Sequence, residues 1–498
     1  MDHTAAAKIL DAFRDRSVIV LGDFYLDEYL HCNLRGISPE MPVLRMRAER
    51  REQAPGAAGN LAANLSRLGA LVYAVGSVGA DSAGAQLKGL LEGCKVNVEC
   101  LLEDPNRCTG VLSRILAAGG GGYYHHARID YEPPRGLSES SSADLLLGLR
   151  GCVKRGEALF LADYDENSPR TGVLSPAMAR SAISAARDVS LPVYASSRCH
   201  PSDFAGADCL ICNEREARLV GFSDAEPPAA AAQDIKRRLG VGTLCVTRGG
   251  SGVICACDSG AFEKPAYRPA AAREPRDVCG AGDTFGAALL LAALSGAGIE
   301  DCLELAGIAA AISVRKAQAG LVSVSEILRE MRYPGIVNDK LVSVQELAGL
   351  LDDLRPTKKI VFTNGCFDLF HSGHVHLLRS ARQFGDVLVV AINSDRSTAE
   401  NKGAGRPVLS ERHRVEILTA LDFVDYVTVF DELTPINVIR QIKPHVMVKG
   451  GDYTPEEVVG RDIVASYGGE VKIVKYQGQT TSSLIRSIKT ASDGTRPT

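Results

Sequence analysis

The sequence predicts an α/β protein with parallel sheets, and three observations support this fold class. Through the first two thirds of the chain, short apolar runs alternate with segments of helical periodicity, as in βαβ units. The runs are almost continuously apolar, which suits strands covered on both faces. The length of 498 residues exceeds the size at which one hydrophobic core stops growing, and so at least two domains are expected.

Six of the apolar runs are expected to be strands of one main sheet. Helices are predicted between them, for example at 83–92 and 177–187. The segment 25–53 breaks the pattern, because it contains alternating stretches that indicate strands outside the main sheet. We expect it to form a small β lid. The six predicted strands are 18–22, 72–75, 158–162, 193–196, 209–212 and 244–247.

Composition excludes several classes of partner. The chain is 45% hydrophobic and 23% charged with a formal net charge of −4, which gives no electrostatic reason to bind nucleic acid or an anionic membrane. Residues 1–16 lack the apolar core of a signal peptide, and no run approaches membrane-spanning length, so we expect a cytoplasmic protein. The fourteen cysteines are scattered without a framework of close pairs, and we expect most to be small, reduced, buried residues.

A glycine turn at 277–285 opens an Ala- and Leu-rich helix and is the candidate phosphate site of the first domain. Small residues let the amides at a helix start close on a phosphate, and a carboxylate beside them can accept the proton of a sugar hydroxyl. Asp283 is therefore the candidate general base. Taken alone, such a turn would equally be a helix cap.

With its context, this turn resembles that of the ribokinase-like sugar kinases, over roughly residues 17–325, and especially the kinase half of the bifunctional heptose kinase and adenylyltransferases. The resemblance implies a three-layer domain with the lid at 37–43. It implies that Gly280, Ala281 and Gly282 form the anion hole and that Asp283 is the catalytic base. The implied sugar-binding residues are Asp23, Gly56 and Asn60, and the implied contacts to ATP are Asn213, Glu216, Thr247, Gly249 and Gly252.

The first domain departs from these kinases at three places. Ala57 stands where a second glycine is expected, 196–199 replaces an Asp-Pro-Lys-Gly segment, and four glycines at 119–122 replace a polar hairpin. We expect His125 and His126, which follow, to be exposed loop residues. Two alternatives therefore stay open: a decayed, non-catalytic dimerisation module, or activity on a different sugar phosphate. The candidate ligands of the sugar's 7-phosphate are Arg51, Arg114, Arg128 and Arg198.

The segment 363–374 is the most informative of the chain, because it places two histidines at a strand-to-helix turn. Residues 359–362 are an apolar strand, and 375–384 have helical periodicity. Free amides and the positive end of the helix dipole favour phosphate at such a turn, and imidazoles can stabilise charge that develops there. The H-x-G-H spacing argues against a helical zinc pair. Capping or core histidines are the plain alternative.

This segment resembles that of the nucleotidyltransferases with the H-x-G-H signature, over about 358–489, and the run at 449–453 is similar to the adenylyltransferase half of the bifunctional heptose enzymes. The resemblance implies a Rossmann-like domain in which His371 and His374 contact the phosphates and a second cluster at 480–486 closes over them. The other implied nucleotide-binding residues are Thr363, Asn364, Gly365, Phe367, Asp368, Asn393, Asp395, Arg406, Lys449, Gly450, Asp452, Ser482 and Ser483.

These observations predict a kinase domain at 1–331, a linker and connecting helix at 332–356, and a transferase domain at 357–498. The resemblance implies two consecutive activities: phosphorylation of heptose 7-phosphate at C1 by ATP, and adenylyl transfer from ATP to heptose 1-phosphate, giving ADP-heptose for a lipopolysaccharide core. It also implies Mg²⁺ with ATP, no structural metal site, small-molecule substrates and a homodimer through the kinase domain. An alternative for the second half is CTP with a polyol phosphate.

Overall fold

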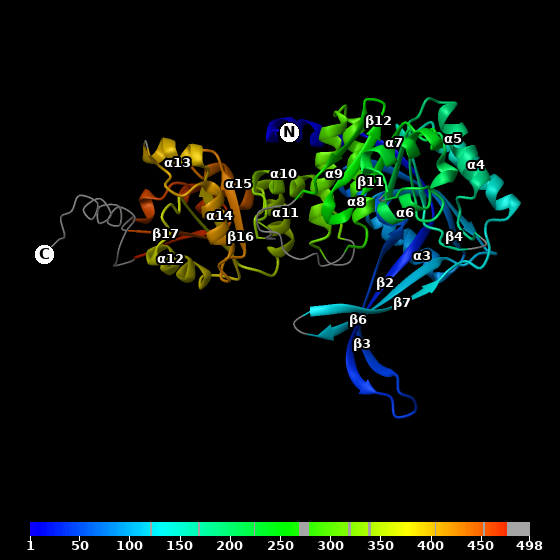
Figure 1. The fold of residues 1–498 in the computed structure, drawn as a ribbon. Coiled ribbons are helices and arrows are strands. Elements are labelled where there is room, and N and C mark those ends of the chain that lie inside the picture. Colours follow the sequence, from blue (N-terminus) through cyan, green and yellow to red (C-terminus); the bar gives the residue numbers. More distant parts are fainter. Residues whose placement is uncertain are drawn as a thin grey trace. The chain divides into compact units, whose positions relative to one another are not determined.

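The computed structural model describes nine stretches of the chain: 1–119, 122–167, 170–223, 225–267, 278–316, 320–336, 340–403, 405–451 and 454–475. The chain divides into two compact units, Met1–Gly335 and Ile336–Thr498 (Figure 1). In the described part of the chain, no helix is both long enough and apolar enough to span a membrane.

A nine-stranded sheet forms the centre of the first unit, counted over the described residues. Seven of its strands are parallel, and β12 and β13 extend one edge in antiparallel pairing. All six predicted strands lie in this sheet, which confirms the predicted parallel architecture. In sheet order, the strands are β13 (Gly260–Lys264), β12 (Val253–Cys257), β11 (Thr243–Thr247), β10 (Cys209–Asn213), β9 (Val193–Ser197), β8 (Ala158–Asp163), β1 (Ser17–Gly22), β4 (Leu71–Gly79) and β5 (Val96–Asp104).

Helices cover both faces of this sheet, and alternate residues of β1 show why. Val18 and Val20 belong to one hydrophobic cluster, whereas Ile19 and Leu21 belong to another on the opposite face. The first cluster is packed by α1 (His3–Asp11), α2 (Ala58–Arg67), α3 (Ser82–Gly93), α8 (Ala281–Leu294), α9 (Ile299–Ser313) and α10 (Val324–Arg332). The second is packed by α4 (Glu139–Cys152), α5 (Pro176–Arg187), α6 (Glu214–Arg218) and α7 (Pro228–Leu239).

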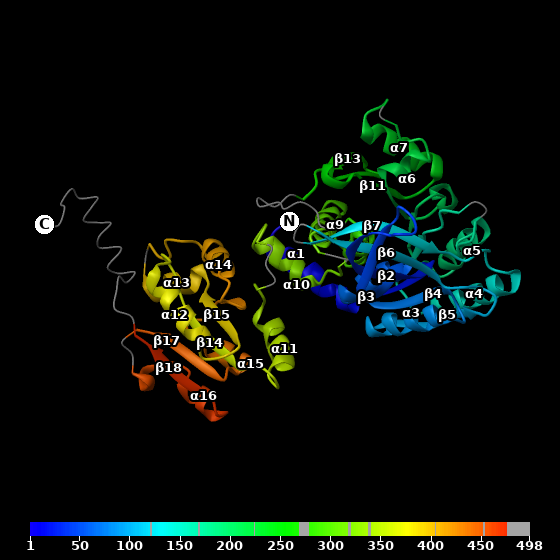
Figure 2. The same cartoon turned by 90° about the horizontal axis from the view of Figure 1, so that it is seen from below.

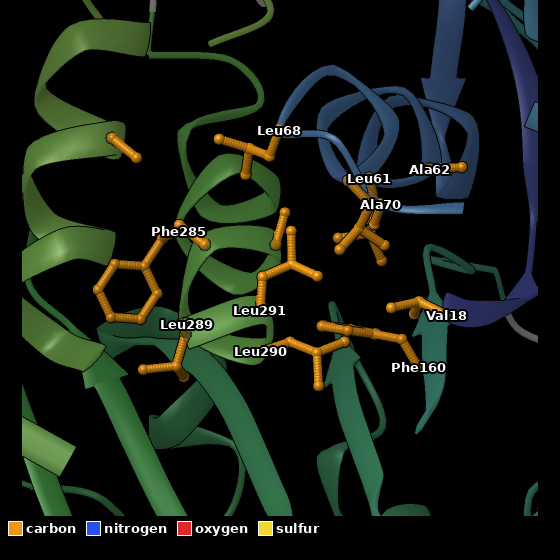
Figure 3. Packing of buried hydrophobic residues seen from close by; sticks show 14 of the residues in the cluster. Val18, Leu61, Ala62, Leu68, Ala70, Phe160, Phe285, Leu289, Leu290 and Leu291 are labelled. Carbon is orange, nitrogen blue, oxygen red and sulfur yellow. The ribbon is translucent and has the colours of Figure 1, made fainter. Parts of the chain in front are cut away.

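The core under α8 is where the first unit gains much of its rigidity near the glycine turn. Figure 3 shows Leu290 and Leu291 of α8 on the side of Leu61 and Phe160, while Phe285 extends from the opposite side of this helix. These side chains are almost fully buried. Burying an aliphatic or aromatic side chain of this size contributes about 1.5–3 kcal/mol, so the helix that begins at the turn is firmly anchored.

Among the described residues, a second sheet of four strands forms the lid, in the order β3 (Leu44–Ala57), β2 (Phe24–Ile37), β6 (Gly110–Gly119) and β7 (Gly122–Tyr131) (Figures 1 and 2). The predicted lid is therefore present, but it is larger than the segment 25–53, because β6 and β7 complete it. The prediction that His125 and His126 lie in a loop is wrong: both lie on β7, with exposed side chains.

The second unit is built on a five-stranded parallel sheet among the described residues, which confirms the Rossmann-like class. In sheet order its strands are β16 (Tyr426–Phe430), β15 (Val387–Asn393), β14 (Ile360–Gly365), β17 (Val446–Gly450) and β18 (Glu470–Val474). Its helices are α11 (Val344–Leu354), α12 (Ser372–Arg382), α13 (Asp395–Lys402), α14 (Glu411–Thr419), α15 (Ile436–Ile442) and α16 (Arg461–Ser466). Helix α11 contacts α15 and β16 and so packs within this unit.

Candidate active sites

The glycine turn of the first unit opens helix α8 and presents the amides of the helix start. Of these, the Ala281 N–H donates to the Val278 carbonyl at 3.5 Å. Gly280 is the N-cap at φ 75°, a left-handed conformation that glycine adopts without strain. No side chain of the described residues caps this helix. Its first amides therefore lack intrahelical partners and sit at the positive end of the helix dipole, as an anion site requires.

Asp283, in the first turn of α8, is held by hydrogen bonds on both carboxylate oxygens. The Asn60 side-chain amide donates to Oδ2 at 2.6 Å, and the Tyr164 hydroxyl donates to Oδ1. Burial raises the pKa of Asp283, while these two hydrogen bonds and the Arg198 guanidinium oppose the rise. The structure thus brings the candidate base together with Asn60, which the sequence had pointed to as a sugar ligand.

A cavity of about 370 Å³ lies between Asp283 and the lid. Three of the four candidate arginines for the 7-phosphate line it, namely Arg114, Arg128 and Arg198, together with His125 and His126. Arg51 is not among the lining residues, and it pairs with Glu28 on the lid. The cavity therefore combines a carboxylate base with several cationic side chains, which fits a phosphorylated sugar.

The sugar side of this cavity presents Asp27, not Asp23. Asp27 lines the cavity and pairs with Arg114 at 3.0 Å. Asp23 is only 1% exposed, and its carboxylate accepts the amides of Tyr164 and Val173 at 3.1 and 2.6 Å. Burial and nearby Asp163 raise the pKa of Asp23 to about 7. Sequence reasoning missed Asp27, although the acidic pair Asp27-Glu28 between apolar residues of a lid strand was a usable sign.

The paired small residues at the end of β3 shape the same region. A methyl group on Gly56 would lie 2.4 Å from Oδ1 of Asp27, so glycine is needed for Asp27 to fit. Ala57 lines the cavity with φ 53° and ψ −127°, a conformation that favours glycine. The alanine at this position is therefore strained, because its backbone keeps a conformation that glycine adopts more easily.

A second cavity, of about 300 Å³, meets the first at Asp283 and Gly280 and extends along the start of α8. Asn213 and Glu216 line it and also form a capping box on α6, with reciprocal hydrogen bonds of 2.8 and 2.9 Å. Asn213 and Glu216 therefore both cap helix α6 and line the cavity. Burial raises the pKa of Glu216 to about 7. Gly282 completes this wall at the helix start.

The unusual segment 196–199 also borders the second cavity. The Ser197 hydroxyl donates to Asp163 at 2.6 Å, and Asp163 itself lines the cavity. Arg198 pairs with Glu166 at 3.1 Å, so the basic charge introduced here is locally balanced.

A third cavity, of about 430 Å³ and largely apolar, shares Thr247 and Gly282 with the second. Gly249 and Gly252 line it with φ values of 50° and 101° around the short turn η3 (Gly249–Ser251), and Ala281 adds to its wall. A flat apolar base could stack in such a space while its phosphates reach the start of α8. Three neighbouring cavities therefore run from the lid past Asp283 to an apolar end.

In the second unit, His371 and His374 lie at the start of α12, where the sequence places them. The His371 backbone N–H donates to Nδ1 of His374 at 3.3 Å, and Nδ1 of His371 accepts the Gly373 amide at 3.1 Å. Burial lowers the pKa of both imidazoles, and burial together with His371 lowers that of His374 to about 4. Both rings are half-buried and neutral at pH 7, so they can donate hydrogen bonds without carrying charge.

Aromatic rings border the pair. The rings of Phe367 and Phe370 lie 5.2 and 5.4 Å from that of His374, centroid to centroid. Phe367 is buried at φ 48°, and its ring lies 3.3 Å from the position a Cβ would take on Gly365. The turn after β14 is thus tightly packed around the histidines.

The carboxyl end of β14 presents polar groups beside Lys449. Among the described residues, the Thr363 hydroxyl and the Asn364 side-chain oxygen are buried without a hydrogen-bond partner. The Lys449 ammonium donates to the Asn364 carbonyl at 3.2 Å, and burial lowers the pKa of Lys449 to about 8. Gly450 follows on β17. Ligands of parallel α/β sheets bind at this end of the strands.

Asp368 and Arg406 form one contact group, since Asp368 accepts the amides of Val408 and Leu409 at 2.9–3.1 Å and pairs with Arg406 at 3.0 Å. The structure therefore brings these two predicted residues together.

Arg414, which sequence reasoning missed, is a buried residue that connects the segments after β14 and β15 by hydrogen bonds. It is 1% exposed, and its guanidinium donates to the carbonyls of Cys366 and Asn393 at 2.7 and 2.8 Å and to Asp395 at 2.7 Å. The predicted residues Asn393 and Asp395 thus both accept hydrogen bonds from the buried Arg414 guanidinium. The predicted residues Asp452, Ser482 and Ser483 lie outside the described residues, as does Asp277.

Comparison with known proteins assigns both units. Residues 20–123 and 172–326 match the pfkB family of carbohydrate kinases, and residues 362–487 match the cytidylyltransferase-like family. The bifunctional protein HldE of Geobacter metallireducens is 38% identical over 483 residues, which are 95% of this chain and 96% of that protein. The bifunctional protein HldE of Caulobacter vibrioides is 36% identical over 495 residues, which are 97% and 98% of the two chains.

Solved structures resemble the first unit in fold. Arabidopsis thaliana ribokinase, complexed with ribose and ATP, aligns with a TM-score of 0.51 at 21% identity and covers 64% of this chain and 99% of its own. Phosphofructokinase-2 of Escherichia coli, in complex with substrates and products, aligns with a TM-score of 0.52 at 18% identity and covers 64% and 99%.

Proposed function

This chain belongs to the family of bifunctional HldE proteins, and we propose from this premise that it carries out two consecutive steps of ADP-heptose synthesis. The chain is a carbohydrate kinase and a nucleotidyltransferase in one polypeptide. The first unit would phosphorylate heptose 7-phosphate at C1, and the second would join the sugar 1-phosphate to AMP. A separate phosphatase has to remove the 7-phosphate between the two steps.

The observation that carries the kinase assignment is the place of Asp283, where the first two cavities meet at the start of α8. A sugar hydroxyl in the first cavity would lose its proton to Asp283 as its oxygen attacks the γ-phosphorus of ATP. The amides of Gly282 and Asp283 would stabilise the charge on the transferred group, and ADP would leave. The apolar third cavity would take the adenine.

Magnesium would accompany the nucleotide. Mg²⁺ in such sites takes one or two carboxylates together with phosphate oxygens. Among the described residues, no cluster of three or more His, Cys, Asp or Glu side chains could hold a metal by itself. Glu216, with Asn213 beside it in the second cavity, provides a carboxylate of the right kind next to the helix start. Bound there, Mg²⁺ would neutralise phosphate charge.

In the second unit, the oxygen of the sugar 1-phosphate would attack the α-phosphorus of ATP, and pyrophosphate would leave. His371 and His374 would donate hydrogen bonds to the phosphate oxygens as charge develops on them. Lys449 would add a positive charge beside the buried oxygen of Asn364. ATP is the proposed nucleotide, and CTP with a polyol phosphate is the competing pair.

A non-catalytic first unit is not favoured. The candidate base, its two hydrogen-bond partners and three neighbouring cavities are all in place. The strain at Ala57 leaves the hydrogen bonds of Asp283 in place, and the positive charge of Arg198 favours the ionised form of this base. The local pairing of Arg198 with Glu166 also keeps the cavity rim from becoming purely basic.

We place the protein in the cytoplasm as a homodimer. All fourteen cysteines are free, which suits a reducing compartment. The lid strands expose large apolar side chains, among them Leu34, Ile37 and Leu44 at 48, 66 and 49% exposure, and such a patch favours a partner surface. Ile37→Asp with Leu44→Asp should convert the dimer to monomer in light scattering, whereas a wild-type chain that is already monomeric contradicts this assignment.

The test of the two activities is a pair of variants in the full chain. Asp283→Asn should lower the kinase kcat about 10²–10⁴-fold, as loss of a general base does, and leave the transferase unchanged. His374→Ala should do the reverse. The assay uses ATP, Mg²⁺ and each heptose phosphate, with ADP, pyrophosphate and sugar-nucleotide products identified by mass. No ADP release by the folded wild type would favour the non-catalytic alternative, and CTP turnover above that with ATP would favour the competing pair.

A further inference from the structure

Tyr164 makes a direct contact with the candidate base of the kinase unit. Its hydroxyl donates to Oδ1 of Asp283, while Asn60 holds Oδ2 at 2.6 Å. Tyr164 lines both the first and the second cavity. The phenol therefore stands at the point where the sugar and phosphate spaces meet.

The position of Tyr164 is fixed from two further sides. Its backbone N–H donates to Oδ2 of the buried Asp23 at 3.1 Å, so the end of β1 holds the loop that follows β8. The Arg198 guanidinium lies 5.3 Å from the centre of the Tyr164 ring, at cation–π distance. A side chain fixed in this way can orient a neighbour, because its own movement is restricted.

We propose that Tyr164 is a positioning residue of the kinase reaction, whose hydroxyl keeps the Asp283 carboxylate ionised and turned toward the sugar hydroxyl. The inference rests on the kinase activity proposed above. It also gives Asp23 a role as the support of Tyr164.

The physical basis is the cost of burying a carboxylate. Burial favours the protonated acid, which could not accept a proton from substrate, whereas two donated hydrogen bonds favour the ionised form. The charged groups that face Asp283 are Arg198, which favours ionisation, and Asp27 and Glu216, which oppose it. Because these charges oppose one another, the hydrogen bonds of Tyr164 and Asn60 are the main interactions that offset the effect of burial on Asp283.

The test is Tyr164→Phe in the full chain, which removes one hydroxyl and keeps the ring. The acid limb of kinase kcat/KM should move up by about one pH unit, a shift that suits one hydrogen bond to a charged group. The loss should be about tenfold on the acid side of the limb and vanish on its alkaline side. The KM for ATP and the transferase activity should stay unchanged.

Tyr194→Phe is the matched control. Tyr194 lies on β9 of the same sheet, 6.3 Å from Phe160 between ring centres, and lines none of the three cavities described above. Its profile should match the wild type.

An unshifted profile in Tyr164→Phe overturns the inference, and so does an equal loss at every pH with a lowered melting temperature. If the folded wild type releases no ADP, the proposed kinase activity fails instead. The inference is then decided by infrared titration of the carboxyl band that Asp283→Asn removes. Tyr164→Phe should raise the midpoint of that band by about one pH unit, and an unchanged midpoint refutes the role.

Discussion

The imidazole rings of His371 and His374 are stacked, with their centres 4.0 Å apart and their planes inclined by 29°. Two protonated rings at this distance would repel each other, and the site is partly buried. Both effects lower the pKa of His374, to about 4 from its ordinary 6.5. The pair is therefore built to work in the neutral form.

This pairing predicts a loss of stability in acid. Between pH 6.5 and about 4 the unfolded chain binds a proton at His374 that the folded chain does not. The free energy of unfolding is therefore not reduced by His374 above pH 6.5, and it decreases as the pH falls from 6.5 toward 4. The wild type should therefore unfold at a lower urea concentration at pH 5 than at pH 7. His374→Gln should make this difference between the two urea midpoints smaller. His376→Gln, on the exposed side of the same helix, is the control, and an equal effect of both would argue against this cause.

Lys449 predicts an alkaline limit for the transferase. Burial lowers the pKa of Lys449 to about 8 from 10.5, so the ammonium loses its proton as the pH rises through 8. The transferase rate should therefore fall above about pH 8. Lys449→Arg keeps its charge at these pH values and should flatten the limb, even if the rate at pH 7 is lower. A wild-type rate that stays level to pH 9.5 would contradict the role of this charge.

Ala57 predicts a stabilising substitution. Its φ of 53° lies in the left-handed region, where a side chain is strained by about 1–3 kcal/mol. Ala57→Gly removes this strain but increases the entropy of the unfolded chain, so we expect a net gain of about 1 kcal/mol. The urea midpoint of the kinase unit measures it. Ala62→Gly, inside helix α2, should instead cost about 1 kcal/mol, and a loss of stability in both variants would refute the strain.

Arg414 predicts a substitution that damages the second unit alone. Arg414→Met should remove the guanidinium that donates to the carbonyls of Leu409, Cys366 and Asn393, and it should cost about 3 kcal/mol. Asp395 would lose the same partner but keep the Glu411 amide. We expect the transferase to lose both stability and rate, while kinase kcat stays unchanged. Arg440→Met, at an exposed position of α15 in the same unit, should change stability by less than about 0.5 kcal/mol. Comparable losses of stability in the two variants would show that the hydrogen bonds of Arg414 do not stabilise the second unit.

The sequence was sufficient for the strands and helix starts that depend on local pattern. Buried parallel strands such as β1 and β8 are continuous apolar runs, and α8 and α12 begin at distinctive turns. The lid strands β6 and β7 were missed because half-exposed strands carry mixed residues, and because they join the lid only through the pairing of β6 with the distant β2.

The missed site residues share one cause. Asp27 faces Arg114, Tyr164 faces Asp283, and Arg414 reaches Cys366, so each matters through a partner far away in the chain. Motifs report only neighbours in sequence. Asp23 was predicted because it follows the first strand. In the structure Asp27 lines the cavity instead, on lid strand β2, where it pairs with Leu112 of β6. Long-range contacts of this kind become visible only once the chain is folded.

Neighbouring cavities of the kinase unit share parts of their walls, first at Gly280 and Asp283 and then at Thr247 and Gly282. A single compound that joins a nucleoside to a sugar phosphate through a phosphate chain would fill the whole row at once. Because linking two ligands saves the entropy of binding the second, such a compound should inhibit more tightly than either half. The row of cavities is thus a ready template for inhibitor design.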